Sequence, residues 1–414
     1  MTLQPLVPRS VLPRLEEALA DSPVVLLQGP RQSGKTTLAR TLAHERGYEY
    51  LTLDDDVVRA AAAADPVRFV DDMPAKAVVD EVQRAPELFT ALKRSVDRDR
   101  RPGRFLLTGS ANLLLTPELA DSLAGRMEAV PLYPLAQAEL EGAEPRFLER
   151  LLSAGFRLAR SERLGKGLAE LIVAGGYPAA LARAPGTRRR AWYRDYVAAL
   201  TQRDVLDIAR VTSTEALARL MQVAASHTAS MLNVSELAAP FQLSRPTIDT
   251  YLSLLGQLFL VDELPAWHSN RLKRLVKTPK LHVTDTGLAA ALTNVSADAV
   301  YRDRRLFGAL LETFVYTELA KQASWRDDDP RLFHLRDRDG VEVDIVVEAH
   351  DGVVAGVEVK AAATVGEEDF KGLKRLRDSL GERFACGVLL HDGDSVLPFG
   401  DRLFAMPVAQ LWAH

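Results

Sequence analysis

Short apolar runs alternate with helical patterns through the first third of the chain. Residues 23–28, 75–81 and 104–109 are mainly apolar and of strand length, while the segments between them repeat apolar positions with a helical period. Strands of about five residues separated by helices are typical of a parallel sheet with crossover helices. The pattern therefore predicts an α/β domain.

Beyond residue 135 the pattern changes three times. Charged helical patterns without a strand-like run come first and are broken at Gly175–Pro178, after which further helices lead to a short β-like stretch at 259–264. From about residue 300 the predicted order is helix, strand, strand, helix, strand. Four domains are predicted, with the bounds 1–135, 136–205, 206–275 and 276–414.

The composition is that of a globular protein. Of 414 residues, 47% are hydrophobic and 26% are charged, and the formal net charge of -4 excludes a generally basic binder. The one cysteine, Cys386, excludes an internal disulfide, and the eight histidines show no zinc-ligand spacing. Charges interrupt the apolar residues at the N-terminus, and no run of about 18 uncharged apolar residues follows. We expect a soluble, cytoplasmic protein without a membrane segment.

A phosphate-loop pattern follows the first predicted strand. It reads glycine, four residues, then Gly-Lys-Thr, and a helical pattern leaves it. Backbone N–H groups of such a loop turn toward phosphates, Lys35 would reach the β- and γ-phosphates, and Thr36 would hold magnesium. We expect ATP and Mg²⁺ as cofactors, with nucleotide contacts from Gly29, Pro30, Arg31, Gln32, Ser33, Gly34, Lys35, Thr36 and Thr37.

Two acidic residues end the apolar run that begins at residue 75. Asp80 would contribute to the magnesium site, and Glu81 would act on the attacking water. The alternative is a strand that simply ends in charged residues. The phosphate loop about 45 residues earlier favours the catalytic interpretation.

Polar groups also end the next predicted strand. Thr108, Ser110 and Asn112 lie at its tip, where Ser110 could sense the γ-phosphate, although strand ends often carry such residues as caps. Arg126 precedes the following apolar run. In ring ATPases an arginine at this place often reaches the neighbouring subunit's nucleotide, which would require a homo-oligomer; the alternative is a surface arginine.

Together these segments resemble one family. Residues 29–39, 78–97, 106–114 and 123–135 are similar to bacterial and archaeal AAA+ ATPases usually described only as ATP-binding proteins. In that family the ATPase is fused to a C-terminal domain resembling the restriction-endonuclease fold, and the likeness covers nearly the whole chain. It implies an α/β protein with a P-loop AAA+ parallel-sheet ATPase, a helical lid and a C-terminal restriction-endonuclease-like α/β domain.

The region after the lid resembles a winged helix. Residues 232–238 and 243–248 read as helix, turn and second helix, with Ser244 as an N-cap, and the stretch at 259–264 would supply wing strands. The second helix presents Arg245 near its start, together with an acid, Asp249. Such a module reads DNA or serves as a packing domain, and the weak local charge leaves both open.

A basic segment follows at residues 270–280. It carries five positive charges and no acid. Phosphate contact is one interpretation, and a solvated linker or subunit interface is the other. The candidate nucleic-acid contacts are Arg245, Arg271, Lys273, Arg274 and Lys277.

The C-terminal region carries a nuclease-like set of residues. Asp344, followed by Glu358-Val359-Lys360, matches the acid, acid-x-lysine arrangement of restriction-type nucleases. Strand alternation puts Glu358 and Lys360 on one face, and Glu312 lies on or beside the apolar stripe of a helix. Glu312, Asp344 and Glu358 would hold magnesium, with Lys360 assisting. The alternative is a structural ion pair of a glutamate with Lys360.

The sequence thus favours a Mg-dependent ATPase whose nucleotide state changes how the C-terminal half engages nucleic acid, possible nuclease activity included. A competing hypothesis from another class is an ATP-gated interaction module that binds a protein partner and cleaves no phosphodiester. The weakly charged second helix and the acidic overall balance favour this alternative.

Overall fold

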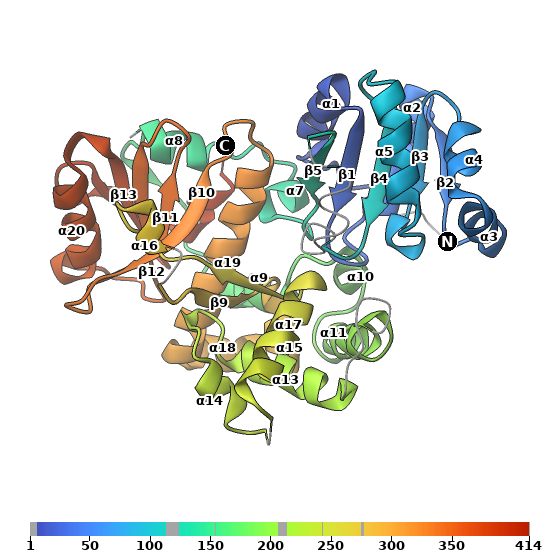
Figure 1. Ribbon diagram of the computed structural model, residues 1–414. Coiled ribbons are helices and arrows are strands. Elements are labelled where there is room, and N and C mark those ends of the chain that lie inside the picture. Colours follow the sequence, from blue (N-terminus) through green and yellow to red (C-terminus); the bar gives the residue numbers. More distant parts are fainter. Residues whose placement is uncertain are drawn as a thin grey trace.

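The computed structural model describes residues 6–413, except for 113–122, 124, 154, 206–212, 242 and 275–276. Its N-terminal part is a five-stranded parallel sheet with the order β2-β3-β4-β1-β5, at the right of Figure 1. The predicted α/β domain with a parallel sheet is confirmed. Its strands are β1 (Val24–Gln28), β2 (Glu49–Thr52), β3 (Ala77–Asp80), β4 (Phe105–Gly109) and β5 (Met127–Pro131).

Helices cover both faces of this sheet because successive strand residues point to opposite faces. Val25 and Leu27 of β1 pack with one layer of helices, and Val24 and Leu26 face the other side. The first layer is α1 (Leu12–Asp21) and α2 (Lys35–Arg46), and the second is α3 (Asp56–Ala64), α4 (Pro66–Asp71) and α5 (Leu88–Arg98).

Most of the predicted lid is helical. Its longer helices, α9 and α11, pack against α17. The elements are α7 (Gln137–Glu141), α8 (Phe147–Ser153), β6 (Ala159–Arg160), α9 (Lys166–Ala174), α10 (Pro178–Leu181), α11 (Thr187–Ala199) and, farther along the chain, α17 (Thr286–Leu292).

A small three-stranded antiparallel sheet with the order β7-β9-β8 lies below the other two sheets in Figure 1. The boundary expected at residues 275–276 divides this sheet, because β9 pairs with both β7 and β8. The elements are α13 (Thr214–Ser226), β7 (Ser230–Met231), α14 (Val234–Ala238), α15 (Arg245–Gln257), β8 (Val261–Leu264), α16 (Arg271–Arg274) and β9 (Lys280–Val283).

The C-terminal part is a seven-stranded mixed sheet with the order β10-β11-β12-β13-β15-β14-β6. Helix α19 packs on one face and α20 on the other. The elements are α18 (Ala297–Arg302), α19 (Arg304–Ser324), β10 (Arg331–Arg336), β11 (Glu342–Glu348), β12 (Val354–Lys360), α20 (Lys371–Leu380), β13 (Phe384–His391), β14 (Ser395–Pro398) and β15 (Leu403–Pro407).

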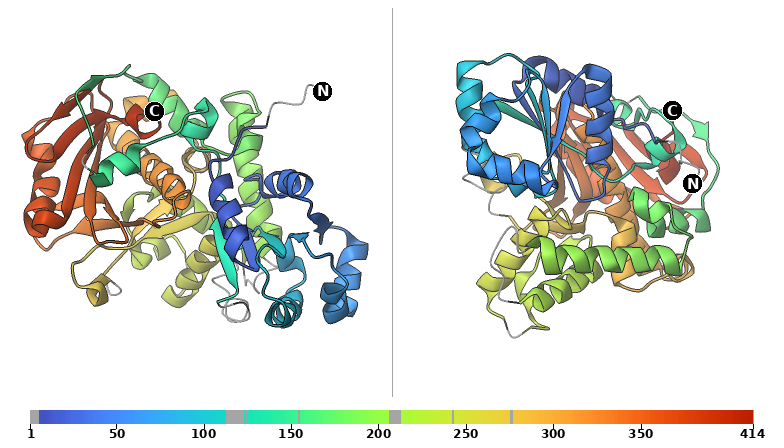
Figure 2. Two further views of the ribbon diagram at one scale, coloured as in Figure 1. Left: turned by 90° about the horizontal axis from the view of Figure 1, so that it is seen from above. Right: turned by 90° about the vertical axis from the view of Figure 1, so that its right-hand side faces the viewer.

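Part of the predicted lid belongs to this C-terminal sheet. Strand β6 pairs with the edge strand β14, and α8 packs on β13. The two large sheets lie on opposite sides of the molecule, as the views in Figure 2 show. Within the described ranges, every helix is too short or too polar to cross a membrane.

Candidate functional site

The loop between β1 and α2 turns sharply at the carboxyl edge of the parallel sheet. Gly29 lies so close to the next chain segment that a Cβ there would stand 2.1 Å from the carbonyl oxygen of Leu132. Gly34 has a φ of 106°, a conformation that favours glycine. The hydroxyl of Ser33 is buried and has no hydrogen-bond partner among the described residues. A buried, unpartnered hydroxyl beside a helix N-terminus suits a phosphate ligand.

Lys35 folds back over this loop. Its Nζ donates to the carbonyl oxygens of Gly29 (2.8 Å) and Pro30 (2.9 Å). Burial lowers the pKa of Lys35 to about 8, although the nearby carboxylates of Glu81 and Asp80 favour the charged form.

We expect ATP binding above about pH 8 to be coupled to proton uptake. Below this pH Lys35 is already charged, whereas above it the free chain holds Lys35 mainly neutral, and a triphosphate would raise its pKa again. Isothermal titration calorimetry in buffers of different ionisation enthalpy measures the uptake. We expect up to about one proton per nucleotide at about pH 9 and almost none at about pH 6.5. Lys35→Arg, which stays charged, is the control, and equal uptake by both chains would contradict the assignment.

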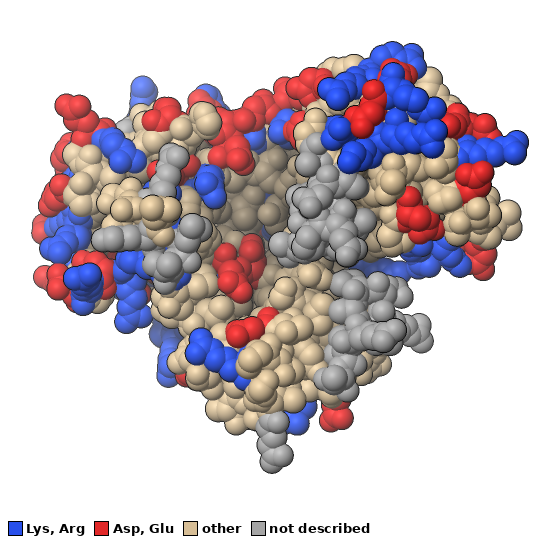
Figure 3. Space-filling model, viewed as in Figure 1, with Lys and Arg blue, Asp and Glu red and all other residues tan. Residues whose placement is uncertain are grey.

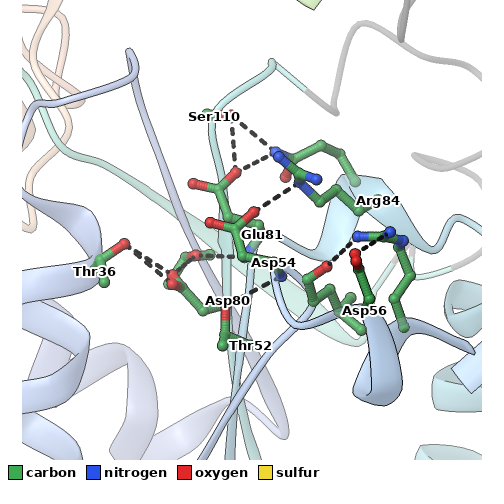
Figure 4. Close-up of polar contacts among 12 residues, drawn as sticks. Thr36, Thr52, Asp54, Asp56, Asp80, Glu81, Arg84 and Ser110 are labelled. Atoms are coloured by element: carbon green, nitrogen blue, oxygen red, sulfur yellow. Dashed lines mark hydrogen bonds and ion pairs between the residues drawn. The ribbon is translucent and has the colours of Figure 1, made fainter. Parts of the chain in front are cut away.

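Asp80 ends β3 beside Thr36, the first hydroxyl of α2 (Figure 4). Thr36 Oγ1 lies 3.1 Å from Asp80 Oδ2, and the hydroxyls of Tyr50 and Thr108 also donate to this carboxylate. The side chain is buried and comes from the carboxyl end of its strand. A hydroxyl and a carboxylate at this separation are oxygen donors of the kind that Mg²⁺ takes, so these residues fit a magnesium site.

Glu81 has a left-handed backbone conformation with a φ of 59°. Its N–H donates to Thr108 Oγ1 (3.0 Å), and its carboxylate accepts from Ser110 Oγ (3.0 Å) and from the Gln83 amide. A non-glycine residue in this conformation costs about 1–3 kcal/mol, and such residues cluster at active sites. Ser110 donates to Glu81, as Figure 4 shows, and its role in sensing a phosphate stays a prediction.

Arg9 is a site residue that the sequence did not reveal. Its guanidinium donates to the carbonyl oxygens of Ser33 (2.7 Å) and Tyr133 (2.6 Å) and to Glu139 Oε1 (3.0 Å). It thereby joins the segment before α1 to the phosphate loop and to α7. No local pattern marks such a residue, because its partner Glu139 is 130 positions away.

Arg126 lies just before β5. Its Nε is 2.6 Å from Asp97 Oδ1 on α5 of the same chain, and 23% of the side chain is exposed. A role of Arg126 across a subunit interface stays a prediction.

Two hydrogen bonds lead directly from the edge of the parallel sheet to the helices beyond it. The Tyr196 hydroxyl on α11 donates to the carbonyl oxygen of Arg31 in the phosphate loop (3.0 Å). The N–H of Asn112, just after β4, donates to the carbonyl oxygen of Gln257 at the end of α15 (2.8 Å). The carboxyl edge of the parallel sheet therefore contacts α11 of the predicted lid and α15 beside the three-stranded sheet.

Asp285 is a buried junction behind these contacts. Its carboxylate accepts from the N–H groups of Gly176 (2.7 Å) and Leu288 (3.0 Å) and interacts with the Tyr193 hydroxyl. Burial raises the pKa of Asp285, while these N–H donors oppose the shift. The carbonyl oxygen of Gly176 accepts from the backbone N–H of Leu135, which follows the last strand of the parallel sheet. One carboxylate thus ties α17 to the turn that the sequence marked as a break in the lid.

The predicted nucleic-acid residues are spread over several environments. Arg245 is exposed at the first residue of α15, whose N-cap is Ser244. The side chain of Arg274 is 10% exposed: it pairs with Glu348 (2.5 Å), and its guanidinium lies over aromatic rings. Lys277 Nζ is 3.4 Å from a backbone carbonyl oxygen of β10. The side chains of Arg271 and Lys273 lie outside the described residues.

Glu348 neutralises the charge of Arg274 in this structure, and a nucleic-acid contact of Arg274 stays a prediction. On the face shown in Figure 3, the surface over α13, α14 and α15 at the bottom is mostly uncharged. The basic segment lies in the connection between β8 and β9, where the wing of a winged helix would be.

The predicted carboxylates of the C-terminal region do come together. Asp344 on β11 and Glu312 on α19 both contact Lys280 Nζ of β9, and Glu358 on β12 interacts with Asp344. Lys360 pairs instead with Asp369 (3.2 Å), so the suggested ion pair of a glutamate with Lys360 is replaced by one with Lys280. Strand alternation predicted the face of Glu358 but not its partner.

Comparison with known proteins divides the chain into three matched regions. Residues 21–141 match the family model of an AAA domain, and residues 165–299 and 307–411 match models described as domains of unknown function. Proteins of Mycobacterium tuberculosis and Mycobacterium bovis, both described as uncharacterised, are 29% identical over 405 residues, which is 97% of this chain and 84% of each relative.

Solved structures also align with the chain, among them the following two. AMPPCP-bound DnaA of Aquifex aeolicus is 14% identical with a TM-score of 0.28, over 59% of this chain and 85% of that one. The Thermotoga maritima RuvB Holliday junction branch migration motor is 17% identical with a TM-score of 0.28, over 62% of this chain and 89% of that one. The AAA model covers the phosphate loop, Asp80 and Glu81, so the N-terminal part of this chain is an AAA-type P-loop ATPase domain.

Proposed function

We propose that this protein hydrolyses ATP with Mg²⁺ at the carboxyl edge of its parallel sheet. The observation that carries the proposal is the meeting of Thr36, Asp80 and Glu81 beside the phosphate loop (Figure 4). Thr36 and Asp80 would hold the metal ion, which supplies charge neutralisation for the leaving phosphate.

The remaining roles follow from the contacts of each side chain. Lys35 would exchange its two loop carbonyls for phosphate oxygens, and Glu81 would orient water and accept its proton. Ser110 and Gln83 hold the Glu81 carboxylate in place. We propose Arg126 as the residue that a homo-oligomer would supply to the neighbouring nucleotide.

Lys35→Ala is expected to abolish ATP hydrolysis and to weaken ATP binding strongly, because it removes a buried cation from the phosphate site. Phosphate release and binding of a fluorescent ATP analogue measure the two effects. Lys371→Ala, at an exposed lysine on α20, is the control and should leave both unchanged. A Lys35→Ala chain that retained turnover would contradict the proposed ATPase site.

We further propose that ATP turnover is linked to DNA engagement by the domain around α15. The order of helices and strands from α13 to β9 is the one expected of a winged helix, Arg245 is exposed on α15, and Gln257 at its end contacts Asn112. The test is ATP hydrolysis at low salt with and without double-stranded DNA, using Lys35→Ala as the blank. A several-fold rise that Arg245→Ala reduces would support the link.

A protein partner is the second candidate, and one observation favours it. A cavity of about 520 Å³ lies between the three sheets, lined by parts of β5, β8, α19 and β10. Figure 3 shows a hollow between the two upper lobes. Its lining includes the acidic side chains of Glu128, Asp262, Glu263 and Asp329 and two arginines, Arg326 and Arg14, the second of which pairs with Glu128. The acids outnumber the arginines, which disfavours DNA in this cavity. ATP turnover unchanged by DNA would favour an ATP-gated module with a protein partner.

A further inference from the structure

One ammonium stands among the carboxylates that would form a nuclease metal site. Lys280 Nζ lies 2.5 Å from Glu312 Oε1 and 3.3 Å from Asp344 Oδ1. The side chain of Lys280 is 6% exposed, and each of these two carboxylates is 14% exposed. The charge of Lys280 is therefore directed into the acidic centre and away from solvent.

The backbone fixes Lys280 in this position. It is the first residue of β9, the central strand of the three-stranded sheet, and it pairs with Met231 of β7 and with Leu264 of β8. Its side chain reaches from the three-stranded sheet to Glu312 on α19 and Asp344 on β11. Figure 1 shows the backbone of β9 beside α19.

Asp344 and Glu358 have further hydrogen bonds in this centre. Asp344 Oδ2 accepts from the N–H of Val359 (3.0 Å), and the Glu358 carboxyl hydrogen-bonds Asp344. A divalent ion needs several such oxygens at about 2.0–2.6 Å, and the ammonium would repel it. The type of donor fits a metal ion, but the arrangement with Lys280 in the middle does not.

The same junction has a second ion pair. Arg274, from the connection between β8 and β9, pairs with Glu348 at the end of β11. The backbone N–H of Trp267 in this connection also donates to the carbonyl oxygen of His334 on β10 (2.6 Å). Lys280 therefore belongs to a series of contacts that join the three-stranded sheet to the C-terminal sheet.

We infer that Lys280 is the resident cation of the acidic centre formed by Glu312, Asp344 and Glu358, so that the native chain takes up no divalent metal ion there. The centre joins two sheets and carries out no metal-dependent cleavage.

Mn²⁺ binding to the nucleotide-free chain, followed by electron paramagnetic resonance, tests this inference without depending on ATP turnover. The native chain and Asp344→Asn should bind Mn²⁺ equally, since any binding near Thr36 and Asp80 is common to both. Lys280→Met should gain a Mn²⁺ site whose affinity is at least about tenfold higher than that of any site in the native chain to which Asp344 contributes. The double variant Lys280→Met with Asp344→Asn should lack this site.

Lys360→Met is the matched control. It removes an exposed lysine of β12 that pairs with Asp369, and this variant should gain no Mn²⁺ site. Mn²⁺ binding by the native chain that Asp344→Asn removes would overturn the inference. This comparison needs no Lys280 variant, so it remains decisive if Lys280→Met does not fold. A folded Lys280→Met chain that gains no site would also overturn it.

Discussion

Glu81→Gln is expected to lower ATP turnover by about 10²–10⁴-fold while leaving ATP binding close to that of the native chain. The amide oxygen of glutamine can still accept from Ser110, so the geometry at the end of β3 is kept. What is lost is the group that accepts a proton from the attacking water. Phosphate release under saturating ATP and equilibrium binding of ATP separate the two quantities.

The control for this experiment is Glu45→Gln, an exposed glutamate on α2, which should not change turnover. Turnover of Glu81→Gln within about tenfold of the native chain would remove Glu81 from the role of general base. A parallel loss of ATP binding would instead show that Glu81 supports the shape of the phosphate loop.

Asp285→Ala is expected to destabilise the chain by about 3–5 kcal/mol, because it leaves the buried N–H groups of Gly176 and Leu288 without an acceptor and removes a partner of Tyr193. Urea unfolding followed by tryptophan fluorescence measures the loss. Trp192 is a suitable reporter, because its ring packs against Tyr193.

Asp298→Ala is the matched control for Asp285. Asp298 is exposed on α18 and pairs with Lys166 at 2.8 Å, and an ion pair that water screens in this way contributes little to stability. Equal losses of stability in the two variants would show that the Asp285 junction contributes no more than a surface contact. Loss of stability only in Asp285→Ala would support its role in joining α17 to the lid.

The ATPase sheet and the residues at its edge could be predicted because their signals are local. The phosphate loop occupies adjacent positions, and the run that ends in Asp80 and Glu81, the proposed metal-binding and catalytic residues, contains the strand β3. Strand β4 lies between β1 and β3, and the carboxyl ends of these parallel strands bring the phosphate loop and Asp80 to the same edge of the sheet.

The second acidic centre shows where local patterns stop being sufficient. Lys280 belongs to a run of cations, and such a run is usually solvated, so the sequence favoured phosphate contact or a linker. Its direction depends on the register of β9 with β7 and β8 and on the packing of α19, which begins 24 positions later at Arg304. Lys360 has the spacing of a nuclease lysine, yet Asp369 is its partner.

Strand β6 shows the same physical limit of local patterns. A two-residue strand such as β6 has no periodicity to detect, and its assignment to the C-terminal sheet comes only from its pairing with β14. Arg163 and Asp392 add an ion pair of 2.8 Å at the same edge. Both contacts join positions more than two hundred residues apart.

Because β6 belongs to the seven-stranded sheet, the C-terminal part of the chain is not one continuous segment of the sequence. The strands of the seven-stranded sheet come from two stretches, Ala159–Arg160 and Arg331–Pro407, with α9–α11 and the whole three-stranded sheet between them. A single cut of the peptide chain anywhere in this long insertion leaves strands of one sheet on both fragments. The three-stranded sheet is therefore an insertion within the sequence of the seven-stranded sheet, and β6 ties the chain before this insertion to the far edge of the last sheet.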